Sequence, residues 1–316
     1  MQKCTDALMH ISAFLHSCIL AFPRAAVAAA LIVLAPSVTE AQIYETVGIR
    51  AQGMSGAFVA VSDDATTTWW NPAGLAAGGY FNTVLEVDRV EDSDVTRARA
   101  FSLTVPSLGI SYYRLSLSGM RPPSTTGSTP ANREDQGVIN QYGITVGQSI
   151  GTHLIVASTV KLVHGLDSTS VDLDTGVMAM YGRMRFGAAV KNLKAPELGE
   201  GPDTFEVPRQ ARAGVSFKAG SANSAEFTVA LDSDLLTTPT AFGDVRHLAT
   251  GGEAWLFGRF IGVRGGVGVN TVGETRRSGS VGASVAFRKG AYVDAQLTRG
   301  ADETRNGWGF SLRLTF

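Results

Sequence analysis

The last eleven residues of the chain alternate between large apolar side chains and small or polar ones. The apolar side chains occupy every second position: Trp308, Phe310, Leu312, Leu314 and Phe316. Successive side chains of a β-strand point to opposite faces, so one face of this strand is apolar and aromatic and the other is small and polar. Such a strand suits the lipid-facing wall of a membrane barrel and also the last strand of a soluble sandwich.

Runs of about ten residues with the same two-residue period follow one another from Tyr80 to the end of the chain. We predict fourteen strands, at residues 80–88, 97–105, 107–117, 138–149, 152–163, 170–181, 183–193, 205–217, 224–235, 246–257, 259–270, 278–287, 289–298 and 306–316. This length matches a tilted membrane-spanning strand.

The connections between these strands supply an independent signal. Mostly very short connections alternate with mostly longer, polar ones, the segment at 164–169 being expected among the longer. An up-and-down barrel with tight periplasmic turns and longer external loops shows this alternation, whereas a sandwich does not require it. The sequence therefore predicts an all-β, antiparallel up-and-down transmembrane β-barrel of about fourteen strands in the bacterial outer membrane, surrounded by outer-membrane lipid.

The N-terminal part of the chain predicts export. Residues 25–34 form an apolar run that is preceded by a cation, and the run is too short for a transmembrane helix, which needs roughly 20 residues. We predict a signal peptide at residues 1–41, with cleavage before Gln42. Both cysteines, Cys4 and Cys18, lie within it, so the mature chain is not expected to be a disulfide scaffold.

Residues 42–79 differ in composition from the strands that follow. Residues that form turns or apolar contacts are frequent among them: Gly53, Gly56, Phe58, Trp69 and Trp70. The glycines permit tight turns or close approach of the backbone. The lumen of a fourteen-strand barrel is wider than the side chains of its wall can fill. We therefore predict that residues 42–79 lie in the lumen as a short, partly helical hatch, and that residues 80–316 form the barrel.

Two short helices are predicted within this segment. Asp63 or Asp64 can cap a helix over residues 65–69. Asn71 can cap a second helix that has Pro72 at its first position. These side chains are explained by the architecture of the hatch, and the alternative is that they contact a ligand.

Two stretches of this segment resemble a known family. Arg-Ala-Gln-Gly-Met-Ser-Gly-Ala-Phe-Val-Ala-Val-Ser-Asp-Asp-Ala at residues 50–65 and Trp-Asn-Pro-Ala-Gly-Leu-Ala at residues 70–76 resemble the N-terminal signature of the FadL-like outer-membrane proteins, and among these the shorter PorV/PorQ branch. The resemblance implies a fourteen-strand barrel with an N-terminal hatch in its lumen. The strand count reached above agrees with this expectation.

Enzymatic and nucleic-acid-binding functions are not expected. A formal net charge of −1 supplies no basic surface for nucleic acid. The histidines that follow the predicted signal peptide, His153, His164 and His247, lack metal-ligand spacing. We therefore expect no catalytic residue, no metal and no cofactor.

Two pairs of acids, Asp172 with Asp174 and Asp232 with Asp234, recur at a spacing of two. Each pair therefore lies on one face of its strand, and we expect that face to be the lumen because carboxylates are disfavoured in lipid. Selection of a polar solute, binding of a cation and ordinary solvation of the wall are all compatible with this placement.

Two functions from different classes remain open. In the first, the protein is a FadL-like channel for hydrophobic small molecules whose hatch acts as the gate. Its ligand-binding or gating residues would then be Gly53, Gly56, Phe58, Asp63, Asp64, Trp69, Trp70, Asn71 and Pro72. In the second, it is a PorV-like barrel that does not transport and instead docks secreted proteins or other envelope components. The first predicts an apolar path to the hatch, and the second predicts a sealed lumen with exposed apolar loop tips.

Overall fold

The computed structural model describes residues 46–90, 96–116, 138–199, 204–221, 223–239, 243–301 and 306–316. The predicted signal peptide at residues 1–41 lies outside these ranges. Within them, no helix is both long enough and apolar enough to cross a membrane.

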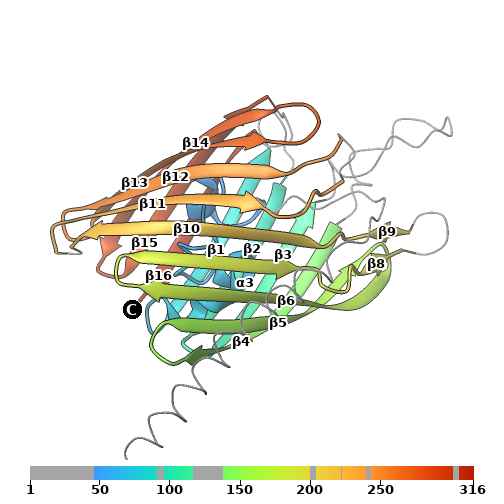
Figure 1. Cartoon of the computed structure of the whole chain (residues 1–316), viewed down its shortest axis with the longest axis horizontal. Coiled ribbons are helices and arrows are strands. Elements are labelled where there is room, and N and C mark those ends of the chain that lie inside the picture. The colour runs from blue at the N-terminus through green and yellow to red at the C-terminus, as the bar shows by residue number, and fades with distance from the viewer. Residues whose placement is uncertain are drawn as a thin grey trace, which may run out of the picture. The chain divides into compact units, whose positions relative to one another are not determined.

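Fourteen strands of the described residues form a closed antiparallel barrel (Figure 1). They are β1 (Asn82–Val90), β2 (Thr96–Val105), β3 (Leu108–Ser116), β4 (Val138–Ile150), β5 (Leu154–Gly165), β6 (Ser168–Tyr181), β7 (Met184–Lys191), β10 (Gln210–Gly220), β11 (Ala225–Asp234), β12 (His247–Leu256), β13 (Ile261–Asn270), β14 (Arg277–Arg288), β15 (Ala291–Gly300) and β16 (Gly307–Thr315). β1 pairs with β16 and closes the sheet, which leaves no strand edge to be satisfied in lipid. The predicted up-and-down topology is confirmed.

One predicted strand, at residues 205–217, is divided in the structure. Residues 205–206 form β9 (Phe205–Glu206), which pairs with β8 (Glu197–Leu198) in a separate two-stranded hairpin. The barrel strand β10 begins only at Gln210 and pairs with β7. Pro208 lies between the two strands and has no N–H to donate to a ladder, which accounts for the interruption.

The connection between β5 and β6 is shorter than expected from the sequence. Only Leu166 and Asp167 separate these strands, and both have positive φ, 50° and 60°. Positive φ at both central residues is the geometry of the two-residue hairpin turn that matches strand twist. The prediction of a longer loop at 164–169 is therefore wrong, because these residues adopt the left-handed conformation without a glycine.

The outer face of the barrel is apolar. Exposed side chains include Tyr142, Ile144 and Val146 on β4, Phe227, Val229 and Leu231 on β11, and Trp308, Phe310 and Leu312 on β16. The residues that alternate with them point inward and are mostly polar and buried, such as Gln141, Thr228 and Ser311. A closed sheet with apolar side chains outside and polar ones inside is the architecture of a bacterial outer-membrane barrel, and it excludes the soluble sandwich.

Residues 46–79, which we call the plug, lie inside the barrel (Figure 1, blue). The plug contains helices α2 (Ile49–Gln52) and α3 (Thr67–Trp70) and the 3₁₀-helix η2 (Pro72–Ala76). Helix α2 contacts β14, β15 and β16, α3 contacts β3, and η2 contacts β2, β4, β5 and β6. Because these strands lie on different sides of the closed sheet, the plug reaches across the lumen.

Candidate functional site

Of the two caps predicted in the second half of the plug, one is formed. The Asp64 carboxylate accepts hydrogen bonds from the Thr66 N–H (2.9 Å) and hydroxyl (2.6 Å), but α3 begins at Thr67, its N-cap residue is Thr66, and no side chain caps it. The prediction that Asp63 or Asp64 caps a helix over residues 65–69 is therefore wrong. Asn71 accepts from the Ala73 N–H at 3.1 Å, with Pro72 at the first position of η2. The predicted Asn71–Pro72 cap is thus confirmed.

Asn71 also joins the plug to the barrel. Its Nδ2 group donates to the carbonyl oxygen of Val59 at 2.9 Å and to that of Val177, on β6, at 3.1 Å. The Cβ atom of any residue replacing Gly176 would lie 2.1 Å from the Asn71 Oδ1 atom. The absence of a side chain at Gly176 therefore allows Asn71 to reach the strand.

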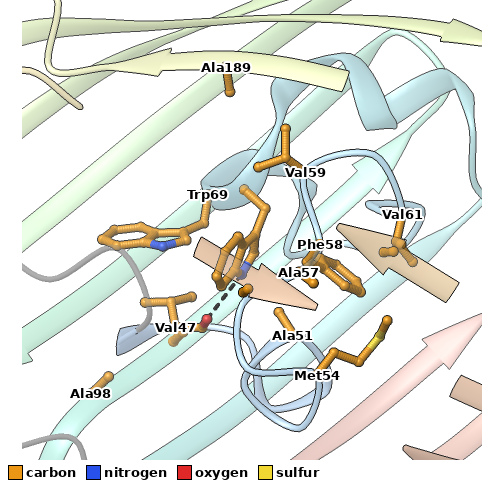
Figure 2. Packing of buried hydrophobic residues seen from close by; sticks show 14 of the residues in the cluster. Val47, Ala51, Met54, Ala57, Phe58, Val59, Val61, Trp69, Ala98 and Ala189 are labelled. Atoms are coloured by element: carbon orange, nitrogen blue, oxygen red, sulfur yellow. Dashed lines mark hydrogen bonds between the residues drawn. The ribbon is translucent and has the colours of Figure 1, made fainter. Parts of the chain in front are cut away.

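The plug has an apolar centre that it shares with side chains of the wall such as Ala98 and Ala189 (Figure 2). The rings of Phe58 and Trp70 pack edge to face with centroids 6.0 Å apart. The Trp70 indole N–H donates to the Val47 carbonyl oxygen at 3.0 Å, the dashed line in Figure 2. Met54 and Val59 are fully buried in the same cluster. These contacts fold the plug as a unit, so Phe58 and Trp70 belong to its interior.

Two wall carboxylates each bind a pair of adjacent plug N–H groups. Glu86 of β1 accepts from Gly48 (2.7 Å) and Ile49 (3.1 Å). Asp232 of β11 accepts from Phe58 and Val59, both at 2.7 Å. Each carboxyl group accepts two backbone hydrogen bonds, so each holds one turn of the plug against the wall.

Arg50 connects the two halves of the plug and the wall. Its guanidinium binds both oxygens of Glu253 on β12, with Nε–Oε1 at 2.8 Å and Nη2–Oε2 at 2.6 Å. Its Nη1 atom binds Asp63 at 2.5 Å and Asp64 at 3.1 Å. Arg264 of β13 lies 3.4 Å from the same Glu253. Two guanidiniums and three carboxylates therefore share one buried cluster.

The opposite charges of this cluster stabilise one another's ionised forms. Burial opposes ionisation of Asp63, but the positive charge of Arg50, helped by that of Arg185, outweighs it and lowers the pKa of the Asp63 carboxyl below its usual value. Burial likewise opposes the charge of Arg50, and Asp63 and Glu253 together raise its pKa. Removing one member of such a buried cluster leaves an uncompensated charge.

The wall strands β2 to β6 meet the plug differently. Trp69 packs edge to face on Tyr113 of β3 with ring centroids 5.0 Å apart, and the Tyr113 and Thr68 hydroxyls are hydrogen-bonded at 2.5 Å. Ala98 and Leu115 belong to the same buried cluster. Around η2, the cluster consists of Ala73, Ile155, Ala157 and Met178. Where α3 and η2 pack against it, this side of the lumen is formed mainly by small, aliphatic and aromatic side chains. Polar side chains such as Ser102, Thr145 and Lys161 are also buried on the same strands.

Glycines on the strands allow the backbone of the plug to approach the wall closely. A Cβ atom at Gly266 of β13 would lie 2.4 Å from the Met54 carbonyl carbon, and one at Gly251 of β12 would lie 2.5 Å from the Met54 carbonyl oxygen. Both distances are too short for a side chain, because the opposing atoms belong to the backbone. The strand glycine at 266 thus packs beside the plug.

The two predicted acid pairs point inward but have different partners. Asp232 binds the plug, and its neighbour Asp234 binds Arg212 at 2.6 Å. Asp172 and Asp174 bind Lys161 of β5, at 3.2 and 2.8 Å. The inward orientation is confirmed, and the partners of both pairs identify them as structural anchors.

Of the other predicted residues, Gly56 has φ of +82°, a conformation that L side chains rarely adopt. Gly53 ends α2 with ordinary helical φ. Sequence reasoning missed Arg50, Glu86 and Glu253. Glu86 and Asp88 recur at a spacing of two on β1, so the rule that found the aspartates would also have placed Glu86 on the inner face. Glu253 has no acid at that spacing. Within the described residues, no group of three or more His, Cys, Asp or Glu side chains could hold a metal ion.

No protein-family model matches the chain, and no curated protein sequence matches it significantly. Solved structures share its fold. The CymD monoaromatic hydrocarbon channel is 14% identical with a TM-score of 0.60, over 85% of this chain and 97% of that one. The toluene transporter TbuX of Ralstonia pickettii is 12% identical with a TM-score of 0.56, over 86% and 99%.

A FadL homologue of Pseudomonas aeruginosa is 11% identical with a TM-score of 0.51, over 90% of this chain and 99% of that one. These structures lend no support to the narrower PorV/PorQ resemblance. At such identities the likeness concerns the fold alone, and in fold this chain is similar to the FadL-like barrels.

Proposed function

We propose that this protein is an outer-membrane channel for hydrophobic small molecules and that the plug is its gate. The observation that carries the proposal is the unequal attachment of the plug. Carboxylates and a guanidinium fix it to β1, β11 and β12. Toward β2, β3 and β5 it presents Trp69 and Ala73 to small and apolar side chains.

This unequal attachment favours one route by which a solute could pass the plug. Displacing the plug from β11 and β12 would separate buried charges, which is costly. Displacing α3 and η2 from β2 to β5 would expose mainly apolar surface, which a hydrophobic solute can cover as it passes. The route would then run past Trp69, Tyr113 and Leu115, between the plug and the apolar wall.

The solved structures with the same fold support the solute class. They include proteins described as a monoaromatic hydrocarbon channel and as a toluene transporter. The small and aromatic side chains beside Trp69 suit a solute of that type. The exposed apolar loop tips expected for the docking alternative would lie largely on connections such as 91–95 and 117–137, outside the described residues.

Two engineered disulfides would test the gate, one on each side of the plug. The Cβ atom of a residue at Gly109 on β3 would lie 2.9 Å from the Thr68 Cγ2 atom, so Thr68→Cys with Gly109→Cys would lock α3 to the apolar wall. The Ser55 and Ser280 hydroxyl oxygens lie 2.8 Å apart, so Ser55→Cys with Ser280→Cys would lock the plug to β14 on the opposite side.

Uptake of a labelled small aromatic and of a labelled long-chain fatty acid would be measured in proteoliposomes with lipopolysaccharide in the outer leaflet, against protein-free vesicles. We expect the Thr68–Gly109 lock to stop uptake until a reductant is added and the Ser55–Ser280 lock to leave it unchanged. Equal block by both locks would refute the route along the apolar wall. Absence of uptake by the wild-type protein would refute the channel itself.

A further inference from the structure

The strand ends at the short turns carry an unequal distribution of charge. We call residues 181–184, 217–227, 256–261 and 286–291 the basic arc. Its cations are Arg183, Lys218, Arg259, Arg288 and Lys289, and its one carboxylate among the described residues is Glu226. Five cations against one carboxylate leave an excess of four positive charges. The arc therefore presents a positive potential at this end of the barrel.

The arc is continuous along neighbouring strands. The Lys218 N–H donates to the Arg183 carbonyl oxygen at 2.9 Å, which joins the end of β10 to the β6–β7 turn. Lys218 and Arg259 both bind Glu226, at 3.0 and 2.8 Å. The Ala286 N–H donates to the Phe260 carbonyl oxygen at 2.8 Å, which joins the β12–β13 turn to the end of β14.

Exposed phenylalanines lie beside these cations. Phe217, Phe227, Phe257, Phe260 and Phe287 are all exposed, Phe257 at 74% and Phe287 at 63%. Phe217 precedes Lys218, and Phe287 precedes Arg288 and Lys289. Aromatic side chains at strand ends mark the boundary between the hydrocarbon and the headgroups. The cations beside them are therefore placed at headgroup level.

The rest of the same rim is different. The short turns at residues 105–108 and 150–154, and the entry to β1 at residues 79–82, contain no Asp, Glu, Lys or Arg. Their exposed side chains include Tyr80, Leu108 and Ile150. The strand ends at the long loops carry both signs of charge, as at Asp244 and Arg246. A rim with a net positive charge and exposed phenylalanines thus belongs to one arc of this end of the barrel.

We propose that the basic arc binds anionic phospholipids of the periplasmic leaflet. Their phosphates would contact Arg183, Arg288 and Lys289, which are exposed, and their acyl chains would lie against the phenylalanines. Lys and Arg are the side chains that pair with phosphate oxygens, and cations close to an anionic membrane surface favour its lipids. This binding is independent of the channel function and would hold for a barrel that transports nothing.

The test measures which lipids remain bound to the full-length protein. Purified protein in detergent micelles is mixed with phosphatidylglycerol or phosphatidylcholine, and bound lipids are counted by native mass spectrometry. The variant Arg183→Gln/Arg288→Gln/Lys289→Gln is compared with wild type. Each cation near an anionic surface contributes about fivefold, so we expect the triple variant to lose most of the preference for phosphatidylglycerol.

The control removes cations from the other ends of β14 and β15, the two strands joined by the turn that carries Arg288 and Lys289. Arg277→Gln/Arg299→Gln changes the long-loop ends of β14 and β15, and we expect it to keep the wild-type preference. Equal loss in both variants, or no loss in the triple variant, would overturn the proposal.

Wild-type protein supplies a second measurement if the triple variant does not fold. The preference for phosphatidylglycerol should fall steeply as salt is added, because salt screens exposed charges. A preference that stays constant up to about 1 M salt, where the Debye length is about 3 Å, would equally overturn the proposal.

Discussion

The two sides of the lumen hold the same plug by different physical means. On the side of β11 and β12, buried carboxylates bind it. Asp232 accepts hydrogen bonds from two backbone N–H groups of the plug, and Glu253 forms an ion pair with the Arg50 guanidinium. On the side of β2 to β5, Tyr113 and Ile155 meet it through packing. Directional, charge-assisted contacts fix a position, whereas apolar contacts can be exchanged for another apolar surface. Under the proposed gating, the first side would be the anchor of the plug and the second side would be the face that opens.

The largest expected effect is on the charged side. Glu253→Gln removes the carboxylate that Arg50 and Arg264 share, and breaking a buried pair in this way costs about 3–5 kcal/mol. We expect the amides of residues 46–79 to lose protection in hydrogen exchange of the folded barrel. Glu274→Gln, at an exposed position, should change little, within about 0.5 kcal/mol. Wild-type protection in Glu253→Gln would show that Glu253 is no anchor.

The second-largest effect on the stability of the plug is expected from a steric change. Gly266→Ala places a methyl group against the Met54 backbone, and overpacking of this kind costs about 1–3 kcal/mol. Gly265→Ala is the matched control, because the nearest atom to its new Cβ is the Ser280 carbonyl oxygen at 3.6 Å. Limited proteolysis of the plug should distinguish the two variants. Equal cleavage of both would mean that the fit at Gly266 does not hold the plug.

Asn71→Ala should have a smaller effect. Asn71 is a polar contact between the plug and β6, next to the apolar cluster around η2. The change removes the cap of η2 and the link to Val177, a loss of about 1–2 kcal/mol. We expect faster hydrogen exchange over residues 71–77 and faster uptake, since the parting face becomes looser. Slower uptake would contradict the assignment of this face as the gate.

The smallest effect is expected at Tyr113. Tyr113→Phe removes the hydroxyl that meets Thr68 but keeps the ring against Trp69. Thr68 retains its hydrogen bond to the Ala65 carbonyl oxygen, so the cost should be about 1 kcal/mol or less. Uptake of the small aromatic should stay at the wild-type rate or rise. A large loss of uptake would mean that the hydroxyl, rather than the apolar surface, serves the solute.

Much of the barrel was predictable because its signal is local. Alternation along β16 and the turn residues between strands can be recognised within about ten residues. The failures are also local and instructive. Leu166 and Asp167 form a two-residue turn with positive φ, a conformation that these residue types rarely adopt. The strand predicted at residues 205–217 did not take into account the interruption at Pro208.

The candidate site was predictable only in part. The Asn71–Pro72 cap depends on neighbours in sequence, and the structure confirms it. Arg50 and Glu253 are 203 residues apart, and no local pattern couples them. The alternation of the strand can place Glu253 on the inner face, but it does not predict which guanidinium will form an ion pair with it.

A lipid-facing barrel of fourteen strands and a compact segment ahead of it can be predicted from the sequence, because both follow from periodicity, turn residues and caps. Only the folded molecule shows that the plug is bound mainly by ions on one side and mainly by apolar packing on the other. These contacts depend on which inner side chains the closed sheet and the folded plug bring within hydrogen-bonding distance, and such distances are set by strand register and closure rather than by any stretch of the chain.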